Sequence, residues 1–123
     1  SVSETDFSHF PKNLSKIVTY SAKWHKESEE FIKTPSICPA KISKLLERKL
    51  KETALNVFEI FGGKDYARVD FRVDKSGKLF VIEFNPNPDI SEGAGYANVL
   101  AASGISYANF VSAIIKSNII GEK

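Results

Sequence analysis

The sequence predicts an α+β fold in which helices pack on an antiparallel β-sheet, and three observations carry this prediction. Between residues 41 and 61, apolar side chains recur every three or four positions, which is the period of a helix with one buried face. Residues 66–74 and 78–85 instead alternate apolar and polar side chains, which is the period of a strand. Two further apolar stripes with helical spacing follow between Gly93 and Ile120.

The N-terminal third carries the weakest signals. Residues 1–13 are polar around Pro11 and two phenylalanines, so we expect a loop or a severed connection there, with the folded unit over residues 14–120. Residues 14–20 (LSKIVTY) are rich in β-branched and aromatic side chains and predict a strand that ends shortly before Lys23. Residues 27–38 show no clean period.

The long helix has recognisable ends. Pro39 followed by Lys41 marks its start, because proline is tolerated in the first turn of a helix. The Gly62-Gly63 pair ends it, because glycine adopts the left-handed conformation of a helix C-terminus without a clash. The predicted buried face comprises Ile42, Leu45, Leu46, Leu50, Ala54, Val57, Phe58 and Phe61.

Residues 66–85 predict a β-hairpin around the turn Asp74–Gly77. One face is apolar and consists of Ala67, Val69, Phe71, Val73, Phe80, Ile82 and Phe84. The opposite face collects Arg68, Asp70, Glu83 and Asn85. The alternation leaves the register open: a four-residue loop places Asp70 across from Glu83, whereas a two-residue loop places Arg68 there.

The two registers predict different chemistry. Opposed carboxylates repel each other unless a cation lies between them, and carboxylate and amide oxygens are ligands that Mg²⁺ takes beside phosphates and water. A nearby arginine would then neutralise phosphate oxygens. Arg68 across from Glu83 would instead be an ordinary surface ion pair. The rigid loop that follows, Asn85-Pro86-Asn87-Pro88-Asp89, favours a binding site, because two prolines fix its path beside the strand end.

Composition excludes several functions. The chain has 123 residues and a formal net charge of +2, which is too small to predict a nucleic-acid or membrane-surface partner. Its one cysteine, Cys38, excludes an internal disulfide. No apolar run approaches the roughly 18 residues of a membrane span, and the N-terminus lacks the pattern of a signal peptide. We therefore expect a cytoplasmic protein.

The order of these motifs resembles a known family. Lys23 in YSAKW, then a helix, then RVDF with Arg68 and Asp70, then E-x-N with Glu83 and Asn85, is similar to the C-terminal half of ATP-grasp ligases of the D-alanine–D-alanine ligase type. The resemblance runs from about Ile17 to Ile115. It implies the C-terminal subdomain of an ATP-grasp fold, within a larger ligase that uses ATP.

The resemblance also implies roles for individual residues. Asp70, Glu83 and Asn85 fall on Mg²⁺ ligands, and Glu83 is expected to bridge two ions that also hold the ATP phosphates. Arg68 falls on the arginine that stabilises the transferring phosphoryl group, and Lys23 falls on a lysine that approaches the phosphates. The implied reaction phosphorylates a small carboxylate with ATP, and an amine then attacks the acyl phosphate. The implied partners are these substrates and the remainder of the parent chain.

One departure from the family concerns the substrate. D-alanine–D-alanine ligases carry a Ser-Leu pair after the E-x-N motif, where a substrate carboxylate is recognised, and Ala94 and Gly95 stand there in this chain. Two alternatives follow: an ATP-grasp ligase with a substrate other than D-alanine, or a degenerate nucleotide-binding or interaction module without catalysis. Asp89 and Glu92, in the loop beside the metal motif, are further candidate substrate contacts.

Overall fold

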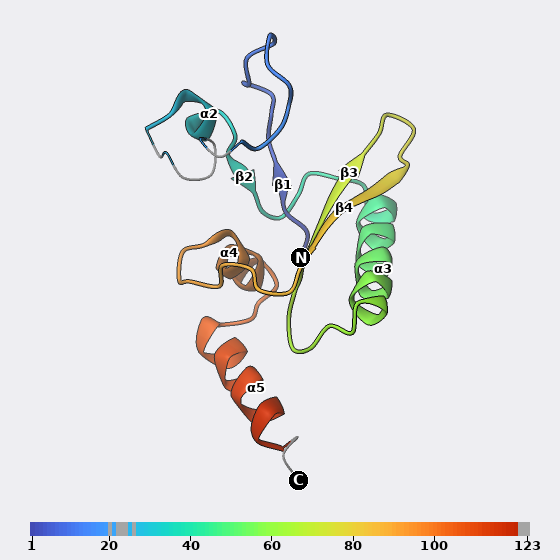
Figure 1. Cartoon of the computed structure of the whole chain (residues 1–123), viewed down its shortest axis with the longest axis vertical. Helices are drawn as coiled ribbons and strands as arrows, with labels where there is room; N and C mark the ends of the chain where they lie inside the picture. The colour runs from blue at the N-terminus through green and yellow to red at the C-terminus, as the bar shows by residue number, and fades with distance from the viewer. Residues whose placement is uncertain (20, 22–24, 26, 121–123) are drawn as a thin grey trace.

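The computed structural model describes every residue except 20, 22–24, 26 and 121–123. Its elements form three parts (Figure 1). An N-terminal part holds β1 (Glu4–Thr5), α2 (Glu29–Ile32) and β2 (Ser36–Ile37), and a central part holds α3 (Lys44–Ile60), β3 (Arg68–Val73) and β4 (Leu79–Asn85). The C-terminal part holds α4 (Gly95–Ala102) and α5 (Tyr107–Ile120), which projects away from the rest. The mixture of helices and antiparallel strands confirms the α+β prediction.

The N-terminal part differs from the prediction. Residues 4–5, expected in a loop, form a strand that pairs antiparallel with residues 36–37. The strand predicted over residues 14–20 is wrong for the described residues 14–19, which are irregular, and Ile17 is 61% exposed. A β-prone sequence becomes a strand only where a neighbouring backbone accepts and donates its hydrogen bonds. The short helix α2 was not predicted, although Ser28 caps it by accepting a hydrogen bond from the backbone N–H of Phe31.

The long helix is confirmed, with a start three residues later than Lys41. Ser43 is its N-cap, and its hydroxyl accepts a hydrogen bond from the backbone N–H of Leu46 at 3.2 Å. At the other end Gly62 adopts a left-handed φ of 63°, as expected for a helix C-terminus. The predicted buried face is only partly buried: Leu50 is 6% exposed, whereas Phe61 is 65% exposed.

The predicted hairpin is confirmed, and it contains an irregularity that the sequence did not reveal. Val73 pairs with Leu79 across a five-residue turn, and a bulge lies where Asp70 pairs with Glu83 but Phe71 pairs with Val81. The residue left over is Ile82. The bulge reverses the alternation of side chains in the half of β4 nearest the turn. Phe80 therefore lies across from Arg72 on the polar face, and not on the apolar face that we expected.

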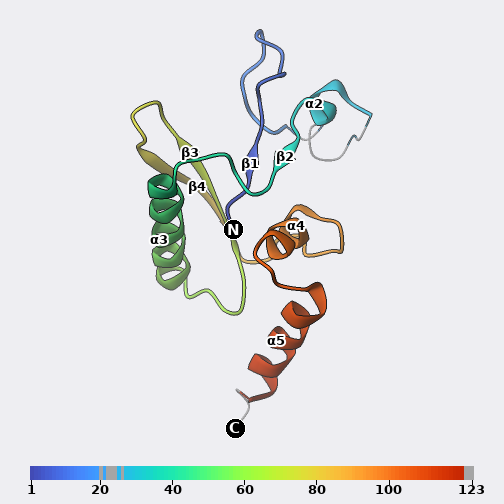
Figure 2. The same cartoon turned by 180° about the vertical axis from the view of Figure 1, so that it is seen from behind.

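Helix α3 lies alongside the hairpin in both views (Figures 1 and 2). The contact is aromatic: Phe84 of β4 stacks on Phe61 with ring centroids 5.0 Å apart, and Phe58 meets it edge-on at 6.4 Å. Because Phe84 occupies the apolar face, α3 covers that face. The polar face of the hairpin is left for the candidate site.

The predicted C-terminal helices α4 and α5 are confirmed, and Gly104 between them adopts a φ of 74°. Within the described residues, the buried apolar side chains are Phe10, Leu50, Val57 and Leu100, together with Pro88. No single helix in this part of the chain is long and apolar enough to cross a membrane. Taken together α4 and α5 would meet that test of length and composition, but they are bent by 99° relative to each other.

Candidate functional site

The candidate site lies where the hairpin strands begin and end. Arg68 pairs with Asn85, and Asp70 pairs with Glu83. Directly opposed residues of an antiparallel pair project from the same face, so these four side chains share one surface. The register is the one that we associated with a metal site, although the chain reaches it through a five-residue turn and a bulge rather than through a four-residue turn.

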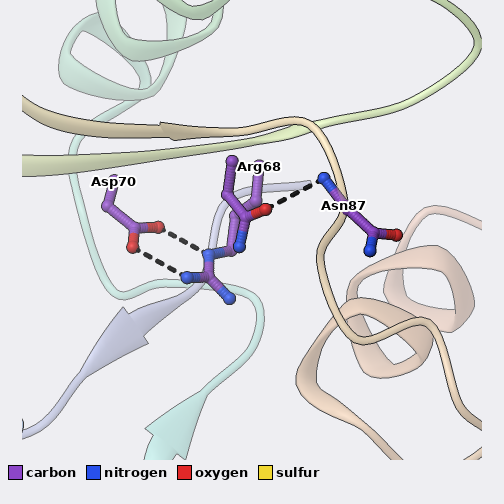
Figure 3. Close-up of polar contacts among 4 residues, drawn as sticks. Arg68, Asp70 and Asn87 are labelled. Atoms are coloured by element: carbon purple, nitrogen blue, oxygen red, sulfur yellow. Dashed lines mark hydrogen bonds and ion pairs between the residues drawn. The ribbon is translucent and has the colours of Figure 1, made fainter.

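Arg68 forms its ion pair along its own strand. Its Nε donates to Oδ1 of Asp70 at 2.8 Å and its Nη2 donates to Oδ2 at 3.0 Å, which is a bidentate arrangement (Figure 3). The two side chains are 42% and 39% exposed. The surface pair between Arg68 and Glu83 that a two-residue loop would have produced is therefore not the arrangement that forms. Glu83 faces a carboxylate across the strands and not a cation.

The loop after β4 is held by short-range hydrogen bonds. The side-chain oxygen of Asn85 accepts from the backbone N–H of Asn87 at 2.9 Å (Figure 3), and Pro88 is buried. Oδ1 of Asp89 accepts from both the hydroxyl and the backbone N–H of Ser91, and these bonds hold the pKa of Asp89 below its usual value. The loop that leaves the site thus has a fixed path, and Asp89 takes part in holding it.

Helix α4 begins directly after this loop. Its N-cap is Ala94, which makes no side-chain capping bond. A serine or threonine at this position would offer a hydroxyl to the first N–H groups of the helix or to a ligand. The departure noticed in the sequence therefore falls on the first turn of α4.

The residues present fit a divalent cation. Two opposed carboxylates and an amide oxygen form an oxygen donor set of the kind that Mg²⁺ takes together with phosphates and water. Each carboxylate oxygen of Asp70 keeps a second lone pair beyond its bond to Arg68. Within the described part of the chain no cluster of three or more His, Cys, Asp or Glu side chains could hold a metal, so phosphates and water would have to complete the coordination.

Two residues qualify the predicted site in different ways. Lys23, predicted to approach the phosphates, lies outside the described residues. Arg72 was not among the predicted site residues, yet it lies on the same strand face as Arg68 and Asp70 and contacts the N-terminal part. The period of two along RVDFRV was the signal that could have drawn attention to it.

Comparison with known proteins identifies a family for nearly the whole chain. The family model described as "D-ala D-ala ligase C-terminus" matches residues 5–116. The chain is 34% identical to an uncharacterized protein, y4sG, of Sinorhizobium fredii over 92 residues, which cover 75% of the chain and 27% of that protein. It is also 34% identical over 98 residues to a D-alanine–D-alanine ligase of Legionella pneumophila, covering 79% of the chain and 26% of that ligase.

A third relative, a D-alanine–D-alanine ligase of Nitrosomonas eutropha, is 32% identical over 97 residues, covering 79% of the chain and 30% of the ligase. The fold is thus that of the C-terminal ATP-grasp subdomain, as the resemblance implied. The chain belongs to the D-alanine–D-alanine ligase C-terminus family. It spans about a quarter to a third of the length of these relatives.

Proposed function

We propose that this chain is the C-terminal part of a longer, cytoplasmic ATP-dependent ligase that joins a small carboxylate to an amine. The observation that carries the proposal is the register of the hairpin, which opposes Asp70 to Glu83 and places Asn85 and Arg68 on the same face. Arg68 already pairs with Asp70, so the carboxylate of Glu83 is the charge that a further cation would neutralise, and family membership makes Mg²⁺ with ATP the cation and ligand to test.

Each residue has a defined task in this proposal. Asp70, Glu83 and Asn85 would hold two Mg²⁺ ions, and the ions would neutralise the negative charge of the ATP phosphates. Arg68, oriented by its two hydrogen bonds to Asp70, would donate to oxygens of the transferring phosphoryl group. Lys23 would approach the same phosphates.

The proposed reaction is the one that the family resemblance implies, and it uses these roles. The oxygen of the acid substrate attacks the γ-phosphorus of ATP and ADP leaves, which gives an acyl phosphate. The amine substrate then attacks the acyl carbon and inorganic phosphate leaves, so that one amide bond forms for each ATP cleaved. Such a reaction depends on positioning and on charge neutralisation and needs no protein nucleophile.

The first turn of α4 favours an acid or amine other than D-alanine. Ala94 has no hydroxyl and makes no capping bond, so it cannot bind a carboxylate through its side chain. The family fold is otherwise retained over residues 5–116. We therefore expect the preferred substrate to differ from that of the ligases with serine at this position.

The test is ADP release by the complete protein with Mg²⁺ and ATP, screened against D-alanine, L-amino acids and other small carboxylates. We expect one of these acids to stimulate turnover. The variant Glu83→Gln should lower stimulated turnover by more than about a hundredfold, because loss of even an outer-sphere partner of a metal costs roughly 10–100-fold. Its fold should be unchanged, since Glu83 is exposed.

The outcomes separate the candidate functions. Stimulation by D-alanine would restore dipeptide synthesis despite Ala94, and stimulation by another acid would support the proposal as stated. Absence of stimulation by every acid, with the same background rate in Glu83→Gln, would show a nucleotide-binding or interaction module without catalysis. Removal of Mg²⁺ with a chelator should abolish turnover in either active case.

A further inference from the structure

Arg72 lies on the polar face of the hairpin beyond the four residues of the candidate site. Side chains alternate along a strand, so Arg72 shares its face with Arg68 and Asp70 and lies about 7 Å along the strand from Asp70. Across the hairpin it pairs with Phe80, which the bulge has moved to this face. Arg72 therefore extends the surface that carries the candidate metal ligands.

The side chain of Arg72 joins this surface to the N-terminal part of the molecule. Its Nη1 donates a hydrogen bond to the backbone carbonyl of Lys16 at 3.1 Å. Its guanidinium carbon lies 6.0 Å from the centroid of the Phe7 ring, at the limit of a cation–π contact. Phe7 in turn packs edge-on against Phe10 at 5.4 Å, and Phe10 is 6% exposed. One side chain thus links the hairpin to the small core of the N-terminal part.

The segment that Arg72 contacts is irregular, and the contacts that hold it include turn hydrogen bonds and a bond from the Thr19 hydroxyl to Glu30 of α2. Residues 14–19 form no strand or helix, and Leu14 and Ile17 are 43% and 61% exposed. A segment without regular hydrogen bonding and with few buried side chains depends on individual contacts for its position. The carbonyl of Lys16, fixed by an arginine from β3, is such a contact.

We infer that Arg72 is a positioning residue that holds the Phe7 ring and the backbone at Lys16 as one wall of the site for a magnesium-bound nucleoside triphosphate. The inference rests on the proposed function, which puts that ligand on the face shared by Asp70 and Arg72. Arg72 acts through the segment that it anchors and takes no part in the chemistry. Loss of Arg72 should therefore weaken nucleotide binding and leave the turnover rate of the enzyme–nucleotide complex unchanged.

The experiment uses the complete protein and measures three quantities. Calorimetry gives the Kd for a non-hydrolysable ATP analogue with Mg²⁺, and steady-state kinetics with the acid found in the screen give the KM for ATP and the kcat. Arg72→Met should raise the Kd and the KM about fivefold, the effect of losing one hydrogen bond and one exposed cation–π contact. The kcat should stay within about twofold of that of the unmodified protein, because the lost contact stabilises the bound substrate and the transition state equally.

Three further variants separate positioning from a general loss of structure. Arg72→Lys keeps a cation that can reach the carbonyl and the ring, so we expect the original Kd to be largely restored. Phe7→Leu removes the ring but keeps an apolar side chain, and should raise the KM for ATP in the same direction. Arg48→Met is the matched control. The Arg48 side chain lies on α3, is 69% exposed and makes a long ion pair of 3.8 Å with Glu52, so its loss should change neither the Kd nor the KM.

Melting temperatures of all variants are measured alongside. If Arg72→Met fails to fold, the other two variants decide the question. A KM for ATP that is raised in Phe7→Leu but not in Arg72→Lys supports the inference. An unchanged Kd and KM in Phe7→Leu overturn it. An unchanged Kd in a folded Arg72→Met, or a fall in kcat at constant KM, also overturns it. A complete protein that does not bind the analogue at all overturns the proposed function and this inference with it.

Discussion

Asp65, just before β3, shows how a single residue joins the segment before this strand to α5. Its φ of 59° lies in the left-handed region, which non-glycine residues rarely adopt. Its carboxylate accepts hydrogen bonds from the Ser117 hydroxyl at 2.5 Å and from the Asn118 amide at 3.0 Å, both on α5. These bonds hold the pKa of Asp65 below its usual value. The segment that leads into β3 is thereby joined to α5.

Aromatic packing supports the same junction. The Tyr66 ring meets the Tyr96 ring at 6.0 Å and the Phe110 ring at 5.5 Å, so α4, α5 and the start of β3 share one cluster. Burial raises the pKa of Tyr96 above its usual value, because the charged phenolate is disfavoured away from water. Arg68 follows Tyr66 by two positions, so this cluster lies directly before the candidate site.

Variants at Asp65 separate its backbone from its side chain. Asp65→Gly removes the carboxylate but tolerates the positive φ, whereas Asp65→Ala removes the carboxylate and keeps the backbone strain. We expect both to unfold at lower urea concentration than the original, and Asp65→Ala to be the less stable of the two. Equal stability of the two variants would show that the left-handed backbone at this position carries no cost.

The pH dependence of the same comparison tests the carboxylate. A lowered pKa in the folded state means that the stabilisation is fully present at neutral pH, above the usual aspartate value of about 4, and is lost as the pH falls through the folded-state pKa. The difference in stability between the original protein and Asp65→Gly, followed by urea unfolding, should therefore shrink in strong acid. A difference that is constant down to the acid limit would contradict this role.

At the scale of elements, the hairpin shows what the sequence could and could not predict. The period of two identified both strands and put Arg68, Asp70, Glu83 and Asn85 on one face, because parity along a strand depends only on the pleat. The register stayed open, because two loop lengths preserve the same parity. The bulge at Ile82 gave no signal, since Val81 and Ile82 are both apolar and β-branched. The predicted face of Phe80 was wrong for that reason.

The other elements were also predicted in part from local sequence and missed in part. Helix α3 was predicted because its apolar period extends over many residues, while its start was misplaced because Ser43 and not the proline supplies the cap. The strand expected over residues 14–20 failed because its formation depends on a partner that local sequence does not specify. Local patterns therefore predicted elements and faces, and tertiary contacts decided ends, partners and register.

The turn of the hairpin gives a prediction at this scale. Gly77 has a φ of 82°, and a Cβ placed on it would meet no atom within 4 Å, so a side chain there costs only backbone strain. Gly77→Ala should therefore destabilise the protein by about 1–2 kcal/mol. Urea unfolding measures the change, and Lys75→Ala, in the same exposed turn, is the control that should have little effect.

Hydrogen exchange would show where the Gly77 effect acts. Amides of β3 and β4 should exchange faster in Gly77→Ala, because the turn closes this pair of strands. Amides of α5 should be unaffected, since α5 is joined to the molecule through Asp65 and the aromatic cluster. Equal stability of Gly77→Ala and the original would mean that the turn relaxes to a conformation without positive φ.

At the scale of the whole molecule, apolar surface lies open on several elements. The most exposed large apolar side chains include Leu55, Ile60 and Phe61 at 63%, 79% and 65%, and Ile82 and Ile119 at 61% and 66%. None of the described side chains is fully buried. Burial of apolar area is the main favourable contribution to folding, so a chain with this little of it gains little stability from its own core.

This exposure predicts how the 123-residue chain behaves by itself. We expect it to bind a dye such as ANS and to unfold in urea with a shallow transition, because accessible apolar side chains bind the dye and a small change in exposed surface gives a small slope. In the complete ligase that we propose, further parts of the protein should cover Leu55, Ile60 and Ile82, so dye binding should fall and the slope should rise. If the isolated chain instead unfolds in a steep transition and binds no dye, it repacks to bury these side chains. The arrangement of α3, β4 and α5 would then form only within the longer protein.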